Sequence, residues 1–75
     1  MKRVILQLMR DLIDENIDED SRLGNPDAWD SLAHLVLISE LEAKFDIFFT
    51  DEEIEKSIVF LDLLGILKRK VGEVK

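Results

Sequence analysis

The chain has 75 residues, which is enough for a single domain over residues 1–75 and leaves little room for a deep catalytic pocket beside a core. Seventeen acidic residues against ten basic ones give a formal net charge of −7, which disfavours binding to the phosphates of nucleic acids. Cysteine is absent, so disulfides, thiol catalysis and cysteine-ligated zinc are excluded.

The N-terminal segment is predicted to be a helix, because apolar side chains recur there at helical spacing: Val4, Ile5, Leu8, Met9, Leu12 and Ile13. The basic start and apolar residues 4–8 resemble the beginning of a signal peptide, but Arg10 and Asp11 interrupt the run and no small-residue cleavage site follows. No apolar run approaches the roughly 20 residues that cross a bilayer. We therefore expect this segment to belong to the fold of a cytoplasmic protein without membrane contact.

A long connection is predicted over residues 15–30, since it contains Gly24, Asn25 and Pro26. Connections of this length in a small domain pack some of their own side chains or serve a function. We expect Ile17, Leu23 and Trp29 to anchor it to the core.

Oxygen-bearing side chains alternate where this connection begins: Asp14, Asn16, Asp18 and Asp20. An EF-hand loop requires glycine at its sixth position and glutamate at its twelfth, which here are Glu19 and Asn25. The pattern therefore does not predict a calcium site, and we expect only nonspecific binding of divalent cations.

The second helix is predicted from Asp30 or Ser31 to about Lys44, and it is apolar around much of its circumference. Such a helix either lies in the core or exposes apolar groups to a partner. The single histidine, His34, belongs to no Ser-His-Asp set and has no cysteine beside it, so we expect it on the surface.

A short third helix is predicted to begin after Thr50, because Thr50 and Glu53 have the spacing of a capping box. Ile54 is expected to face inward from it. Ser57 is the expected N-cap of a fourth helix over residues 59–70.

The fourth helix has a clear apolar stripe, which predicts its buried face: Phe60, Leu63, Leu64 and Leu67. Gly65 lies inside it, where glycine costs about 1 kcal/mol relative to alanine. We expect Gly65 to permit close packing of helices, and we expect Gly72 and the residues after it to fray.

Ser31 is the main candidate for a functional residue, because it lies where the long connection meets the second helix. Free backbone N–H groups and the helix dipole favour a negative charge there, so the position suits a serine that carries a phosphodiester-linked group. A role as N-cap alone is the alternative. Ser21, Ser39 and Ser57 are poorer candidates: the first lies in an acidic loop, the second inside a helix and the third resembles a cap.

Asp30-Ser31-Leu32, followed by residues 41–46 and by Thr50-Asp51-Glu52-Glu53-Ile54-Glu55-Lys56, resembles the acyl carrier proteins over about residues 29–67. The resemblance implies an all-α fold, a small four-helix bundle of acyl-carrier type. It would have three longer helices, a short third helix and a long loop between the first two.

The same resemblance implies that Ser31 carries 4′-phosphopantetheine. A phosphopantetheinyl transferase would attach this arm from coenzyme A, with Mg²⁺ needed only during attachment. Asp30 would cap the helix and help to hold that metal, with capping alone as the alternative.

The resemblance further implies that the chain is no enzyme. It would hold acyl or related groups as thioesters on the arm and present them to acyl-loading and acyl-processing enzymes. Leu32, Val36, Glu40 and Ile54 would contact these partners. Nothing in the sequence indicates oligomerisation, so we expect a monomer.

The second helix departs from the family pattern. Many acyl carriers of fatty acid synthesis have acids along it, whereas this chain has Ala33, Val36, Ala43 and Lys44 at such positions and keeps Glu40 and Glu42. We expect less long-range steering of partners and a specialised pathway, for example for a polyketide, a modified lipid or a surface glycan. The alternative function is an acidic helical adaptor with the same fold that is never modified and acts only by docking to a basic surface.

Overall fold

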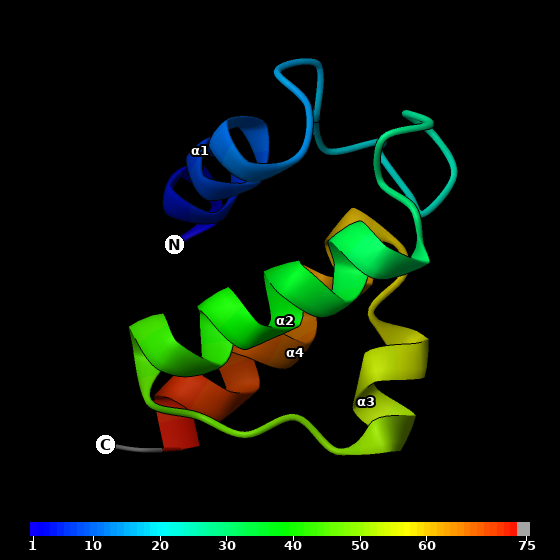
Figure 1. The fold of residues 1–75 in the computed structure, drawn as a ribbon. Coiled ribbons are helices and arrows are strands. Elements are labelled where there is room, and N and C mark those ends of the chain that lie inside the picture. The colour runs from blue at the N-terminus through cyan, green and yellow to red at the C-terminus, as the bar shows by residue number, and fades with distance from the viewer. Residues whose placement is uncertain (74–75) are drawn as a thin grey trace.

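The computed structural model describes residues 1–73, with only the backbone described at Glu73. Residues 1–73 form four helices and no β-strand (Figure 1): α1 (Lys2–Leu12), α2 (Ser31–Phe45), α3 (Asp51–Lys56) and α4 (Phe60–Glu73). The prediction of an all-α fold with three longer helices, a short third helix and a long first connection is confirmed. None of these helices is both long and apolar enough to cross a membrane.

The core is formed by one cluster of buried apolar side chains from three helices and the connections between them. Its members are Ile5, Met9, Ile17, Trp29, Leu37, Ile38, Leu41, Phe49, Phe60, Leu63, Leu64, Ile66 and Leu67. The predicted stripe of α4 is buried as expected. In α1 the stripe is buried only in part, because Val4 and Leu12 are exposed.

The connection between α1 and α2 is fastened to the core, as predicted. Ile17 and Trp29 are fully buried, and Leu23 packs against the same cluster. The Leu23 amide donates a hydrogen bond to the carbonyl of Ile58 at 2.7 Å. Gly24 adopts a φ of +92°, a conformation that side chains disfavour, and its amide donates to the carbonyl of Trp29 at 2.7 Å.

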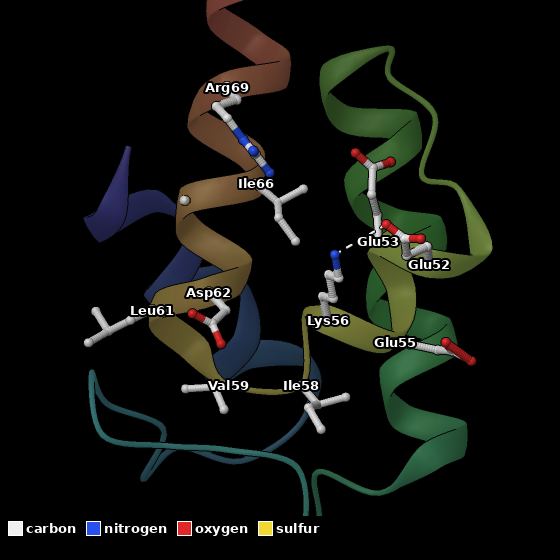
Figure 2. A pocket seen from close by; sticks show the side chains of 11 residues that line it. Glu52, Glu53, Glu55, Lys56, Ile58, Val59, Leu61, Asp62, Ile66 and Arg69 are labelled. Carbon is white, nitrogen blue, oxygen red and sulfur yellow. Dashed lines mark hydrogen bonds and ion pairs between the residues drawn. The ribbon is translucent and has the colours of Figure 1, made fainter.

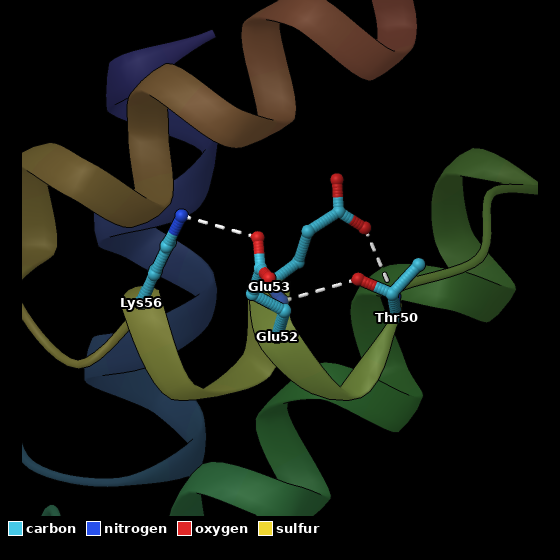
Figure 3. A network of polar contacts seen from close by, with 4 residues as sticks. All are labelled: Thr50, Glu52, Glu53 and Lys56. Atoms are coloured by element: carbon cyan, nitrogen blue, oxygen red, sulfur yellow. Dashed lines mark hydrogen bonds and ion pairs between the residues drawn. The ribbon is translucent and has the colours of Figure 1, made fainter.

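The capping box predicted at the start of α3 is present (Figure 3). The Glu53 amide donates to Oγ1 of Thr50 at 3.2 Å, and the Thr50 amide donates to Oε1 of Glu53 at 2.9 Å. Because α3 has only one and a half turns, these bonds at its first turn contribute much of its local stability.

The prediction that Ser57 caps α4 is wrong. Ser57 is the C-cap of α3, is fully buried, and donates a hydrogen bond from Oγ to the carbonyl of Ile54 at 2.8 Å. The amide of Phe60 at the start of α4 instead donates to the carbonyl of Ser21 at 3.0 Å. The first turn of α4 is therefore capped by the backbone carbonyl of Ser21, which is distant in sequence, and not by the side chain of Ser57.

Both expectations about the glycines of α4 are also wrong. Gly65 is exposed, and a Cβ built on it would meet no heavy atom within 4 Å, so it does not serve close packing of helices. Helix α4 continues through Gly72 to Glu73 instead of fraying there. Residues 74–75 lie outside the described part of the chain.

Replacing Thr50 with alanine should remove the side-chain half of the capping box and lower the free energy of unfolding by about 1 kcal/mol. Urea denaturation followed by circular dichroism measures this change. Ser39→Ala is the matched control, because Ser39 is exposed inside α2, where alanine favours the helix. An equal loss in both variants would contradict the stabilising role of the cap.

Candidate functional site

Ser31 is the first residue of α2, and its side chain is exposed. Asp30 is the N-cap, with an extended backbone, and its Oδ1 accepts a hydrogen bond from the amide of Ala33 at 2.8 Å. Leu32, directly after Ser31, is 72% exposed. The helix cap is therefore supplied by Asp30, which leaves the Ser31 hydroxyl at the surface without a capping role.

The electrostatic surroundings of Ser31 contain opposing contributions. The first turn of α2 contains no acidic side chain, and its backbone N–H groups and dipole favour an anion. The carboxylate of Asp30, which is exposed, repels an anion on the neighbouring residue. A divalent cation between this carboxylate and a phosphate would remove that repulsion.

The other three serines differ from Ser31 in burial or in position. Ser57 is fully buried and Ser21 is only 5% exposed. Ser39 is exposed but lies in the middle of α2, where backbone N–H groups are used within the helix. Ser31 is therefore the one serine that combines exposure with a helix N-terminus.

A chain of buried hydrogen bonds fixes this end of α2 to its surroundings. Nε1 of Trp29 donates to Nδ1 of His34 at 3.1 Å, and Nε2 of His34 lies 3.0 Å from Oγ of Ser57 and 3.2 Å from the carbonyl oxygen of Ile54. The indole N–H is only a donor, so Nδ1 must accept and the proton of a neutral His34 is on Nε2. The chain joins the end of the long connection, α2 and the end of α3.

The prediction of a surface position for His34 is wrong, since its side chain is only 4% exposed. The reason is visible in the helical period. His34 precedes Leu37, Ile38 and Leu41 by three, four and seven residues, so it lies on the face of α2 that points to the core. The helical period of the sequence therefore already indicated that His34 is buried. The lack of catalytic partners for His34 says nothing about its burial.

Burial lowers the pKa of His34 from its ordinary value of 6.5, and the hydrogen bond to the Ile54 carbonyl opposes that shift. A protonated ring would also direct an N–H from Nδ1 at the N–H of Trp29, and two donors cannot bond each other. The imidazole is therefore held in its neutral form.

Three of the predicted partner-contacting residues share one face of α2. Leu32, Val36 and Glu40 are four residues apart and all exposed, with Val36 at 45%. Leu35, 54% exposed, adds a further apolar group that the prediction did not include. Ile54 is not on this face: its side chain is half-buried against the core, as expected for its inward orientation.

An ion pair between Lys70 and Glu53 joins α4 to α3. Nζ of Lys70 lies 2.8 Å from Oε1 of Glu53 and 5.6 Å from the ring centroid of Phe49. The hydrogen bond from Lys70 lowers the pKa of Glu53, and the bond from the Thr50 amide adds to this effect. The carboxylate of Glu53 is therefore ionised at neutral pH.

Within residues 1–73, no group of three or more histidine, aspartate or glutamate side chains is arranged to hold a metal ion. No protein-family model, curated protein or solved structure matches this chain.

The neutral state of His34 predicts a pH-dependent stability. Because the folded pKa is lowered below 6.5, the unfolded chain binds the proton first as the pH falls. Stability is fully present above about pH 6.5 and decreases below it, by at most about 1.4 kcal/mol per pH unit. Urea denaturation between about pH 5.5 and 7 measures this slope, in a window where Glu53 stays ionised.

His34→Gln is the control for this measurement, because glutamine keeps an amide donor and acceptor but does not titrate. Its free energy of unfolding should be lower than that of the wild type at pH 7 and nearly independent of pH over the same window. Parallel pH dependence in the two proteins would contradict the assignment to His34.

Proposed function

We propose that this protein is a discrete acyl carrier protein with 4′-phosphopantetheine attached to Ser31. The observation that carries the proposal is the exposed Ser31 at the first residue of α2, with Asp30 as the cap on one side and the exposed Leu32 on the other. The order of the helices, with a long connection before α2 and a short α3, supports a bundle of acyl-carrier type.

In the attachment step, Ser31 Oγ attacks the phosphorus of coenzyme A that bears the pantetheine. A base of the transferase takes the serine proton, the new O–P bond forms, and the pyrophosphate bond breaks with release of adenosine 3′,5′-bisphosphate. The N-terminal dipole of α2 favours the resulting phosphodiester, and Mg²⁺ held transiently near Asp30 offsets the repulsion from its carboxylate.

The folded domain would supply position and recognition, whereas the arm would supply the thioester chemistry. The buried contacts of Trp29 and His34 hold the first turn of α2 in one position, so that the arm would extend from a fixed point. Because the arm would supply the chemistry, the protein would need no catalytic side chain of its own. We propose that it acts as a monomeric carrier in the cytoplasm.

Partner enzymes would dock on the face of α2 formed by Leu32, Leu35, Val36 and Glu40. Three of these four exposed side chains are apolar. Contact with this face would therefore depend more on burial of apolar surface than on ion pairs. This supports a dedicated set of loading and processing enzymes in a specialised pathway over the general system of fatty acid synthesis.

Incubation of the unmodified protein with coenzyme A, Mg²⁺ and a promiscuous phosphopantetheinyl transferase tests the proposal. Intact-protein mass spectrometry should show a gain of one arm in the wild type and in Ser39→Ala, and no gain in Ser31→Ala. Ser39→Ala is the matched control because Ser39 is also an exposed serine of α2.

A gain that persists in Ser31→Ala would assign the modification to another residue and overturn the proposed site. No gain under conditions that modify a control carrier would overturn the carrier function. That second result would favour the unmodified acidic adaptor, whose exposed α2 face would then serve docking alone.

A further inference from the structure

Two buried side chains bond each other across the first turn of α2. Asp30 is the N-cap, so Trp29 is the residue directly before the cap and His34 is the fourth residue after it. Nε1 of Trp29 donates to Nδ1 of His34 at 3.1 Å, and the ring centroids lie 5.9 Å apart. These are the two positions of a hydrophobic staple, which fixes the angle at which the chain enters a helix. In this Trp29–His34 staple the contact is a directional hydrogen bond, which restricts that angle further.

The Trp29 side of the staple is fixed by its own backbone. The side chain of Trp29 is fully buried. Its amide donates to the carbonyl of Pro26 at 3.0 Å, and its carbonyl accepts from the amide of Gly24 at 2.7 Å. The end of the long connection is therefore held in place before the chain reaches the cap of α2.

The His34 side of the staple is fixed by the end of α3, where Nε2 lies 3.0 Å from Oγ of Ser57 and 3.2 Å from the carbonyl oxygen of Ile54. No residue of α3 is fully buried, and an open groove of about 950 Å³ lies between α3 and α4 (Figure 2). The ion pair of Glu53 with Lys70 holds the first half of α3, and the bonds to His34 hold its end. The staple therefore sets the end of α3 against the start of α2.

Ser31 lies between the two fixed ends of the staple, which are five positions apart in the chain. Within this segment Oδ1 of Asp30 accepts from the amide of Ala33 at 2.8 Å, and the Asp30 carbonyl accepts from the amide of His34 at 2.8 Å. The backbone on both sides of Ser31 is thus held, while its side chain is exposed. The direction in which the Ser31 hydroxyl leaves the helix follows from the staple.

We propose that the Trp29–His34 staple positions Ser31 for transfer of the phosphopantetheine arm, so that His34 is a positioning residue of this reaction. The inference rests on the proposed function. In the transfer Ser31 Oγ forms a bond to phosphorus, a base of the transferase takes its proton, and adenosine 3′,5′-bisphosphate leaves. Oγ must approach in line with the breaking bond, and misplacement of a reacting group by about 1 Å can slow a reaction about a hundredfold.

The staple acts on the approach of Oγ and not on docking. The face of α2 that would contact partner enzymes includes Leu32 and Val36, which are exposed, whereas His34 is buried on the side that points to the core. Loss of the staple leaves that exposed face in place. We therefore expect such a loss to lower kcat for the transfer and to change KM for the carrier little.

The test measures transfer from coenzyme A by a promiscuous transferase, followed by intact-protein mass spectrometry at a temperature at which circular dichroism shows every variant to be folded. His34→Leu removes the acceptor of the indole N–H, Trp29→Phe removes the donor, and His34→Gln keeps both a donor and an acceptor. Ile5→Val is the matched control, because it lowers stability through the buried face of α1 and does not touch the staple.

His34→Leu and Trp29→Phe should each lower kcat about tenfold and change KM less than about twofold. The double variant should be no slower than the slower single variant, because both changes break the same bond. His34→Gln should recover at least about half of the wild-type kcat, and Ile5→Val should react like the wild type.

The indole resonance of Trp29 gives a readout that is independent of the transferase, since this is the only tryptophan of the chain. In ¹H–¹⁵N spectra of the unmodified proteins, the indole proton should move upfield in His34→Leu and stay near its wild-type position in His34→Gln, because only the leucine variant lacks an acceptor. An indole resonance that does not move in His34→Leu would overturn the staple itself.

Three kinetic results would overturn the positioning role and leave the proposed function intact. They are an unchanged kcat in His34→Leu, an effect confined to KM, and a loss of kcat in His34→Gln or Ile5→Val as large as that in His34→Leu. A wild-type protein that stays unmodified where a control carrier is modified would overturn both the proposed function and this inference.

Discussion

The buried hydrogen bonds of the neutral His34 imidazole hold three segments of the molecule together. The ring accepts the indole N–H of Trp29 on one side and meets Ser57 and the Ile54 carbonyl on the other. Loss of the ring would leave the buried indole N–H of Trp29 without its acceptor, at a cost larger than that of a single exposed hydrogen bond, whereas Ser57 and the Ile54 carbonyl would stay bonded to each other. Because the ring joins the long connection, α2 and the end of α3, it fixes where α2 begins. Ser31 lies one turn before it, and the position of that serine follows from the position of the ring.

The distribution of charge complements this arrangement. Residues 13–30 contain seven acidic side chains and one basic one, so this segment carries most of the net charge of the chain. The exposed face of α2 beside it is mainly apolar, with Leu32, Leu35 and Val36. In the proposed carrier, attraction at long range would come from the connection and contact at short range from α2.

Local signals predicted the local features well. The spacing of Thr50 and Glu53 predicted the start of α3, and the stripe that contains Phe60 and Leu67 predicted the buried face of α4, because each depends on neighbours along the chain. The error at Ser57 concerns contacts with distant residues, whereas the burial of His34 was indicated by the helical period and was missed. Ser57 has the residue type of a cap, but its hydroxyl is used by His34, and the carbonyl of Ser21 takes the amide at the start of α4. No local sequence pattern predicts the hydrogen bond between the Phe60 amide and the Ser21 carbonyl. Whether Ser31 is modified is likewise decided by a second protein and not by this fold.

The anchoring of α2 is tested most directly by measuring which nitrogen of the His34 ring carries the proton. Long-range ¹H–¹⁵N NMR correlations distinguish the two ring nitrogens and show which of them carries the proton. At neutral pH we expect a neutral ring with the proton on Nε2 and with Nδ1 as acceptor for the indole N–H of Trp29. A proton on Nδ1, or a charged imidazolium, would contradict this expectation, since the bond from Trp29 would then have no acceptor and the first turn of α2 would lose its anchor.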